Sequence, residues 1–380
     1  MTYRLLLLAD LHLDRTFAAL GCRPEVARLR RNGLRDALRR AGEIAKSRDC
    51  DAVAIAGDLY EHERAGLDTE RFLVDTFSSW RPLRVFLAPG NHDSLLPGSL
   101  YLRAAWSDNV HLFTAPQLTP VALDGGLVLW GLAHREPTWQ GDPLASGGPG
   151  AGEPGVHLAL FHGAELGSRP ETKSLHGPFR ASAIRERGFA AALCGHYHRR
   201  RIDSGSGLVY PGSPEPLALD ETGGRGPVIV NLDAGGDISY EPLDTNRWTA
   251  LLVACDLGGV RSSSSICDAA VAVTRSALDG VNPERALVRI DCRGAIEPPV
   301  SVDPLAVQQA LADQLGVAMV SVVDQTSPAL DLEAVAREQS VRGAFLRLAR
   351  AAAADAVDAA EAGELSDAVH YGLAALGGVP

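Results

Sequence analysis

The chain has 380 residues, of which 46% are hydrophobic, enough for the cores of two or three domains. Its formal net charge of −11 argues against a protein covered with basic surface. The six cysteines are scattered without a Cys-x-x-Cys pair, which argues against a disulfide framework or a thiolate zinc site.

No stretch approaches the roughly 18 consecutive apolar residues of a membrane span. The leucine run at residues 5–8 is shorter than the apolar region of a secretory signal, which has about 7–15 residues, and Asp10 interrupts it. We therefore expect a cytoplasmic protein with no membrane partner.

Short apolar strands alternate with helical segments through the first 245 residues, which predicts an α/β framework with strands buried on both faces. The expected strands are residues 3–10, 50–58, 83–91, 127–134, 156–163, 189–196, 208–214 and 226–233. Helices are expected at residues 24–49, with one glycine break, and at 69–80 and 180–188. Residues 141–155 are expected to form a loop, because nine of these fifteen are Gly or Pro.

A second strand–helix–strand–helix–strand pattern follows, at residues 249–257, 262–278, 285–294, 304–316 and 317–323. We predict three parts: a first domain at 1–245, a small α/β cap at 246–328 and a helical segment at 329–380.

Polar residues stand at the ends of five predicted strands, in the order Asp10 and His12; Gly57-Asp58; Gly90-Asn91-His92-Asp93; His162; and Gly195-His196-Tyr197-His198. Ligands of such sheets bind beyond the carboxyl ends of the strands, so these side chains are expected in one place. A single Asp-x-His or His-x-His is more often structural or accidental. The prediction of a shared site therefore rests on all five motifs occurring in this order.

This set contains carboxylates, an amide and imidazoles but no thiolate, which suits two divalent metals such as Mn, Fe or Zn. Two metals about 3.5–4 Å apart need a shared carboxylate, and they clamp the attacking and leaving oxygens of a displacement at phosphorus. The pattern therefore favours hydrolysis of phosphate esters.

These motifs resemble the full signature of the calcineurin-like metallophosphoesterases. The segments "ADLHLD", "AGDLYEH", "LAPGNHDS" and "VYPGSPEPLALDETGGRG" are similar to those of SbcD-type DNA repair nucleases and their YhaO-like relatives. The resemblance implies a four-layer α/β/β/α sandwich with a small α/β cap and a helical C-terminal tail. It covers the first domain to about residue 245 and the cap more loosely.

The resemblance also implies roles for the matched residues. One metal would be held by Asp10, His12, Asp58 and His198, and the other by Asp58, Asn91, His162 and His196, with Asp58 bridging. A hydroxide between the metals would attack phosphorus. His92 would face the phosphate and protonate the leaving oxygen, and Asp93 would orient the His92 ring.

Two positions depart from the nuclease pattern: Asp14 stands where many members have Gly, and Glu61 where some have His. Arg15, His62 and Arg199 are candidate substrate contacts, although surface salt bridges explain the arginines equally well. We expect structural or surface roles for His134 and His176, and the basic stretch between Arg15 and Arg40 is more simply read as a solvated helix face.

Three functions remain open. The first is a Mn-dependent DNA exonuclease or endonuclease in DNA repair, with an SbcC-type coiled-coil ATPase as partner and a homodimer as its assembly. The second is a phosphodiesterase or phosphatase acting on small molecules, which the acidity of the chain favours. The third is a scaffold with a vestigial metal site, which the complete ligand set disfavours.

Overall fold

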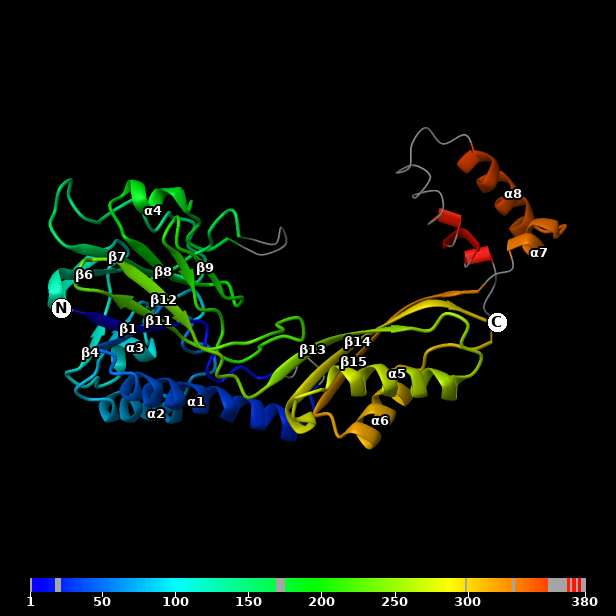
Figure 1. Cartoon of the computed structure of the whole chain (residues 1–380), viewed down its shortest axis with the longest axis horizontal. Coiled ribbons are helices and arrows are strands. Elements are labelled where there is room, and N and C mark those ends of the chain that lie inside the picture. The colour runs from blue at the N-terminus through cyan, green and yellow to red at the C-terminus, as the bar shows by residue number, and fades with distance from the viewer. Residues whose placement is uncertain are drawn as a thin grey trace. The chain divides into compact units, whose positions relative to one another are not determined.

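The computed structural model describes residues 2–17, 22–168, 175–297, 299–329, 332–354, 368–369, 371–373 and 375–376. Its contacts divide the chain into two compact units, Met1–Ala250 and Leu251–Pro380 (Figure 1). The division into functional domains at residues 245 and 328 stays a prediction. No helix in the described part of the chain is both long and apolar enough to cross a membrane.

The first unit contains a six-stranded sheet in the order β12-β11-β1-β2-β3-β4. Its strands are β1 Tyr3–Leu8, β2 Ala52–Ile55, β3 Arg84–Leu87, β4 Val110–Leu112, β11 Val228–Leu232 and β12 Ile238–Pro242. Strands β1 to β4 run parallel, whereas β11 pairs antiparallel with β1 and β12. The carboxyl ends of β1, β2 and β3 therefore meet at one edge.

A second six-stranded sheet of this unit has the order β5-β6-β7-β8-β10-β9. Its strands are β5 Thr119–Ala122, β6 Leu127–Gly131, β7 Val156–His162, β8 Ala191–Gly195, β9 Arg201–Asp203 and β10 Leu208–Tyr210. The central strands β6, β7, β8 and β10 are parallel, which brings the ends of β7 and β8 together. Strands β4, β5, β9 and β12 were not predicted, because each has only three to five residues and lacks a marked apolar pattern.

The leucine run of β1 shows how the layers form. Leu5 and Leu7 pack into a core shared by the two sheets, while Leu6 and Leu8 pack into a core under the helices of the first sheet. Those helices are α1 Pro24–Ser47, α2 Leu67–Ser79 and the short α3 Leu100–Arg103. A third core lies between the second sheet and α4 Ser182–Glu186 (Figure 1). The predicted four-layer α/β/β/α sandwich is confirmed.

Helix α1 corrects one detail of the sequence analysis, because it is continuous through both Gly33 and Gly42. A Cβ added at Gly42 would lie 2.2 Å from the indole Nε1 of Trp80, and one at Gly33 would lie 3.1 Å from that of Trp248. The glycines therefore let two tryptophans pack against the helix backbone and do not interrupt the helix.

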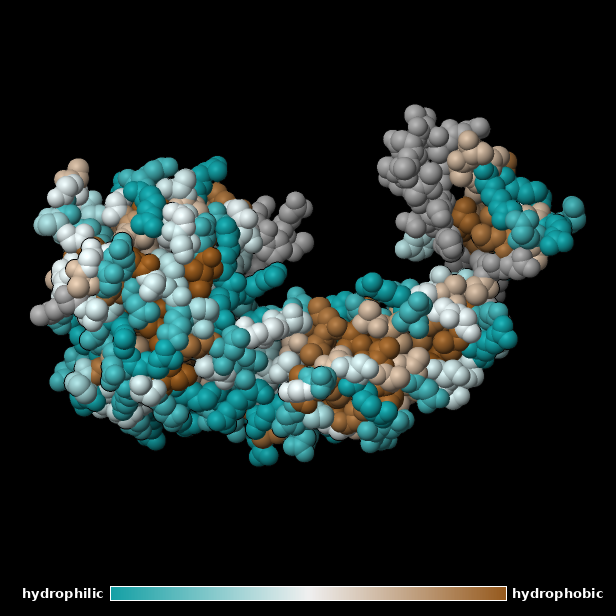
Figure 2. Space-filling view, in the orientation of Figure 1, coloured by the Kyte–Doolittle hydropathy of each residue, from teal (hydrophilic) through white to brown (hydrophobic). Residues whose placement is uncertain are grey.

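The second unit has a three-stranded sheet in the order β13-β14-β15, with a core against two helices. Its elements are β13 Thr249–Asp256, α5 Ser263–Ala277, β14 Ala286–Ile296, α6 Pro304–Leu315, β15 Met319–Pro328, α7 Leu332–Arg337 and α8 Val341–Ala354. Asp303 caps α6 by accepting from the amide of Leu305 at 2.9 Å, and Gly316 ends this helix in the left-handed conformation. Apolar side chains also reach the surface of this unit (Figure 2). Leu252 and Leu305 are among its exposed residues.

We predict that Gly42→Ala lowers the free energy of unfolding by about 1–3 kcal/mol, the usual cost of overpacking a core. Helix propensity alone predicts a gain of about 1 kcal/mol for the same change, so the sign separates the two effects. Urea denaturation measures the difference. Asn32→Ala, at an exposed position of α1, is the control, and a stabilised Gly42→Ala protein would contradict the packing argument.

Candidate metal centre

The loops that follow β1, β2 and β8 carry their polar residues in an uncommon backbone conformation. Asp10, His12, Asp58 and His196 have φ values of 53°, 49°, 52° and 110°. Positive φ costs a non-glycine residue on the order of 1–3 kcal/mol and is concentrated at functional sites. The first two loops support each other, since the amide of His12 donates to the carbonyl oxygen of Asp58 at 2.9 Å.

The carboxylate of Asp58 lies at the middle of the cluster. Its Oδ2 is 3.3 Å from Nε2 of His162 and 3.5 Å from Nε2 of His12, and its Oδ1 accepts from the amide of His92 at 2.9 Å. Asp10 receives the amide of His196 at 2.9 Å, which joins the ends of β1 and β8. Five segments distant in sequence therefore converge, as predicted from the strand ends: the loops after β1, β2, β3 and β8 and the last residue of β7.

Among the described residues, three groups of side chains place their ligand atoms within 4.8 Å of one another: Asp10, His12 and His198; Asp10, Asp58 and His162; and His12, Glu61 and His92. Asp10 belongs to the first two groups, and Asp58 to the second. The structure thus brings five of the seven predicted ligands together in these groups, all but Asn91 and His196. The division between two ions and the bridging role of Asp58 stay predictions.

The orientation of the imidazoles fits divalent metals. Nδ1 of His12 donates to Glu61 at 2.9 Å, Nδ1 of His162 to the oxygen of Ala56 at 3.0 Å, and Nδ1 of His198 to Glu221 at 2.7 Å. Metal-ligating histidines are commonly held in this way through their second nitrogen.

Within the described part of the chain, two of these imidazoles have no hydrogen bond at their other ring nitrogen. Among the described residues, Nε2 of His12, Nε2 of His162 and Oδ1 of Asn91 are buried without a hydrogen-bond partner. Buried polar atoms normally have partners, so such a set around carboxylates indicates cation binding.

The pKa shifts of these groups also indicate a cation site. Burial lowers the pKa of His162, but the Asp58 carboxylate outweighs burial and raises this pKa to about 9. Burial raises the pKa of Asp58, but His162 and His12 outweigh it and hold the pKa well below its usual range. The carboxylates therefore create a strongly negative potential where the Nε2 atoms face.

His92 lies beside these groups and is the most open of them, with 42% of its side chain exposed. Its Nδ1 donates to Oε2 of Glu61 at 2.9 Å, while Oε1 of the same carboxylate binds His12. Burial lowers the pKa of His92, but Glu61 outweighs it and raises the pKa above its usual range. One carboxylate thus orients both a predicted metal ligand and the predicted acid.

Asp93 has a different place from the one expected, because the described hydrogen bonds of the His92 ring go to Glu61. Asp93 is fully buried and accepts from the amides of Gly90 at 2.6 Å and Leu59 at 2.7 Å, and from the hydroxyl of Tyr101 at 2.7 Å. Burial raises its pKa to about 6. Asp93 therefore ties together the backbones after β2 and β3, which corrects the expectation that it orients His92.

The unexpected Asp14 also has a physical explanation. Its φ is 69°, a conformation that glycine adopts at no steric cost, which fits the glycine expected at this position from the family resemblance. Here the Asp14 carboxylate accepts from the hydroxyl of Thr69 and lies 3.5 Å from Nη2 of Arg35. These contacts tie the loop after His12 to α1 and to the first turn of α2.

The three candidate substrate contacts have different surroundings. Nη1 of Arg15 lies 3.9 Å from Glu61, and Nδ1 of His62 is buried without a hydrogen bond to the described residues. Arg199 is exposed. Their roles as substrate contacts stay predictions.

Arginines of the basic stretch between Arg15 and Arg40 have structural roles. Arg30 is 2% exposed, donates to the oxygen of Pro216 at 2.6 Å and stacks 3.8 Å from the centre of the Phe17 ring. Arg40 pairs with Glu215 at 2.6 Å. The stretch is therefore not a uniform phosphate-binding face.

Sequence reasoning missed Glu221 and undervalued His176. Burial raises the pKa of Glu221, but its hydrogen bond with His198 outweighs burial and lowers the pKa to about 2. The ring centres of His176 and His196 are 5.6 Å apart, which places His176 at the centre. His176 belongs to no motif, and Glu221 lies in the quoted segment 209–226 but had no assigned role. Only their long-range contacts reveal their place at the centre. His134 has a structural role, with Nε2 2.7 Å from the oxygen of His162.

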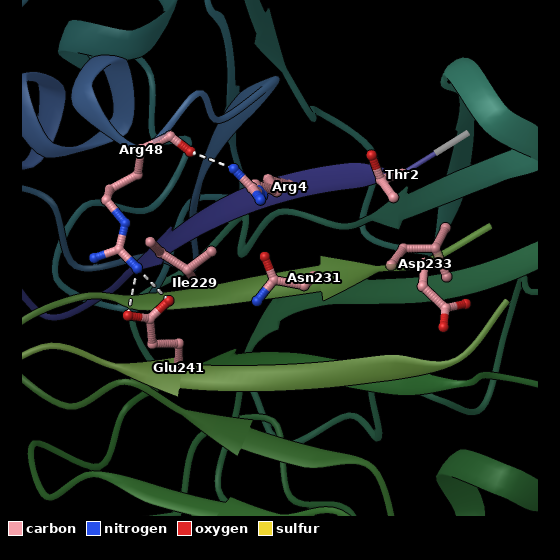
Figure 3. A pocket seen from close by; sticks show the side chains of 8 residues that line it. Thr2, Arg4, Arg48, Ile229, Asn231, Asp233 and Glu241 are labelled. Carbon is pink, nitrogen blue, oxygen red and sulfur yellow. Dashed lines mark hydrogen bonds and ion pairs between the residues drawn. The ribbon is translucent and has the colours of Figure 1, made fainter. Parts of the chain in front are cut away.

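A separate hollow of about 260 Å³ lies at the start of β1, the end opposite to Asp10 (Figure 3). Arg4, Arg48 and Glu241 line it, and Arg48 already pairs with Glu241. This hollow has none of the predicted metal-binding residues.

We predict that Glu61→Gln lowers the pKa of His92, because a neutral amide no longer favours the imidazolium. NMR titration of the His92 ring in metal-free protein measures the change, with the exposed neighbour Glu63→Gln as control. A raised pKa stabilises the fold fully below the ordinary value of about 6.5, and this stability is lost as pH rises through the raised value. An unchanged His92 pKa in Glu61→Gln would contradict the assignment.

The match to a known family covers the part of the chain that contains these motifs. The model of the calcineurin-like phosphoesterase family matches residues 3–200. The uncharacterized metallophosphoesterase YhaO of Bacillus subtilis (strain 168) is 28% identical over 243 residues, covering 61% of this chain and 58% of that protein. The DNA double-strand break repair protein Mre11 of Methanopyrus kandleri is 25% identical over 388 residues, covering 90% of this chain and 77% of that protein.

Among solved structures, TT1561 of Thermus thermophilus aligns with a TM-score of 0.39 and 16% identity, covering 64% of this chain and 99% of that chain. This likeness is too distant to add to the assignment. The chain spans less than two thirds of the length of the Bacillus relative. Because the family model matches more than half of its residues, the chain belongs to the family of calcineurin-like phosphoesterases.

Proposed function

We propose that this chain is a Mn-dependent DNA nuclease that hydrolyses phosphodiester bonds with two divalent cations. The observation that carries the proposal is the cluster around Asp58, in which the buried Nε2 atoms of His12 and His162 face a carboxylate with His92 exposed beside it. Oxygen and imidazole ligands suit Mn, and also Fe or Zn.

Different residues of the chain have different roles in the proposed reaction. Two divalent cations bound there would polarise a phosphoryl group and lower the pKa of a water molecule. His92, with its raised pKa and 42% exposed side chain, is placed to give a proton to a leaving oxygen. Glu61 holds the His92 ring, and Asp93 holds the two loops that carry Asp58 and His92.

The choice of DNA is supported by the relative from Methanopyrus kandleri, a DNA double-strand break repair protein that aligns with 90% of this chain. The "YPGSP" segment supports the same branch of the family. As part of this proposal, the enzyme acts in the cytoplasm in DNA repair, as a homodimer and with an SbcC-type coiled-coil ATPase.

A small phosphodiester or phosphomonoester is the second candidate substrate. Its support is the charge balance: the chain carries −11, and Arg35, Arg40 and Arg201 are paired with acids. Paired arginines are less available to a nucleic-acid backbone, whose binding relies on neutralising phosphates.

The test is cleavage of labelled single- and double-stranded DNA in Mn²⁺, with free and with blocked ends. We expect wild type to cut, a chelator to abolish cutting, and His92→Ala to cut about 10²–10⁴-fold more slowly through loss of a general acid. Cleavage of blocked substrates identifies endonuclease action, and protection by blocking identifies exonuclease action.

His111→Gln, on β4 and outside the cluster, is the matched histidine control. DNA left intact by wild type, or cut equally by His92→Ala, would refute the nuclease. Hydrolysis of a chromogenic diester by a protein that leaves DNA intact would favour the second candidate.

A further inference from the structure

The segment between β10 and β11, residues 211–225, is called here the brace loop. Its Gly212 has a φ of 77°, and a Cβ there would lie 2.6 Å from the oxygen of His198. The amide of Ser213 donates to that same oxygen at 3.0 Å. The loop therefore lies directly against the backbone that carries His198.

Glu221 fixes the His198 ring from within this loop. Its Oε1 accepts from Nδ1 of His198 at 2.7 Å, and its Oε2 accepts from the amide of Leu217 at 2.8 Å and the hydroxyl of Ser213 at 3.1 Å. With both oxygens engaged, the carboxylate has little freedom to rotate, so the imidazole it holds has one preferred orientation.

Arg225 connects this arrangement to the end of the first unit. Its Nη1 donates to the oxygen of His198 at 2.6 Å, and its Nε donates to the oxygen of Glu221 at 2.9 Å. Its backbone accepts from the amide of Thr245 at 2.7 Å and donates to Oδ1 of Asn246 at 2.9 Å. One residue thus joins the predicted ligand to residues 245–246.

Glu215 makes the second connection. It is 2% exposed and accepts from Nη2 of Arg40 at 2.6 Å and from the amides of Arg247 at 3.1 Å and Trp248 at 3.0 Å. Trp248 is buried against Gly33 of α1. The brace loop therefore holds residues 245–248, three positions before the second unit begins at Leu251.

We propose that Glu221 is a positioning residue for His198, and that the brace loop makes the orientation of this imidazole depend on how residues 245–248 are held. The inference rests on the proposed function only in taking His198 as a metal ligand. A displacement of residues 247–248 moves Glu215. The short segment from residue 215 to 221 then transmits this movement to the Glu221 carboxylate that holds His198. The brace loop thereby couples metal binding to the segment that leads into the second unit.

The test measures Mn²⁺ binding to the full-length chain by isothermal titration calorimetry. Glu221→Gln keeps the shape but removes the charge, and we expect one of two Mn²⁺ ions to bind roughly 10- to 100-fold more weakly. Glu215→Gln touches no predicted ligand, and we expect the same ion to bind roughly threefold to tenfold more weakly. The matched control is Glu241→Gln, which loses a carboxylate paired with Arg48 at the distant hollow (Figure 3) and leaves both affinities unchanged.

Wild-type affinities in Glu221→Gln would overturn the positioning role, and wild-type affinities in Glu215→Gln would overturn the coupling. Thermal unfolding of each variant shows whether it folds. If Glu215→Gln does not fold, Arg40→Lys weakens the same anchor from α1, and an unchanged Mn²⁺ affinity in it would equally overturn the coupling.

Hydrolysis of a chromogenic phosphodiester gives a second readout. We expect excess Mn²⁺ to restore the kcat of Glu221→Gln with little change in KM, because the defect lies in metal binding. A defect that excess Mn²⁺ leaves in place would contradict a positioning role. Neither measurement uses DNA, so failure of the nuclease proposal and failure of this one are separate results.

Discussion

The buried carboxylate of Asp58 is the group on which the rest of the centre depends. It is 2% exposed and lies between His12, on the loop after β1, and His162, the last residue of β7. It also receives the amide of His92 from the loop after β3. A charge in that position is stable only when cations or donors surround it. The two sheets and their loops satisfy this need by bringing nitrogen atoms from distant parts of the chain to one carboxylate.

Holding these groups requires a strained backbone, and other carboxylates support it. Asp10, His12 and Asp58 are all left-handed, and Asp93 receives amides from the loops beside them. Glu61 and Glu221 then orient the imidazoles of the centre. The acidic residues around the predicted ligands therefore act in a layered way, with some facing the cation site and others fixing the backbone and the rings.

The strand ends could be predicted because apolar runs buried on both faces have a clear pattern, and the residues after them belong to recognisable motifs. Glu61 was noticed only as a departure from related sequences, and Glu221 was not singled out. Their importance comes from hydrogen bonds to His12, His92 and His198 across 49, 31 and 23 positions. No local periodicity records contacts of that separation. The assignment of Asp93 to the His92 ring failed for the same reason, since adjacent positions need not point at each other.

The leucines before Asp10 show most clearly what the sequence determines and what the tertiary structure adds. The sequence by itself determined that this run is a buried strand and that Asp10 and His12 stand where it ends, because burial on both faces demands apolar residues throughout. Only the tertiary structure decided that alternate leucines enter different cores and that Glu61 joins His12 to His92. It also decided that Asp14 occupies a left-handed position usual for glycine. Those features depend on which surfaces of the folded chain meet, and that follows from packing the two sheets and their helices together.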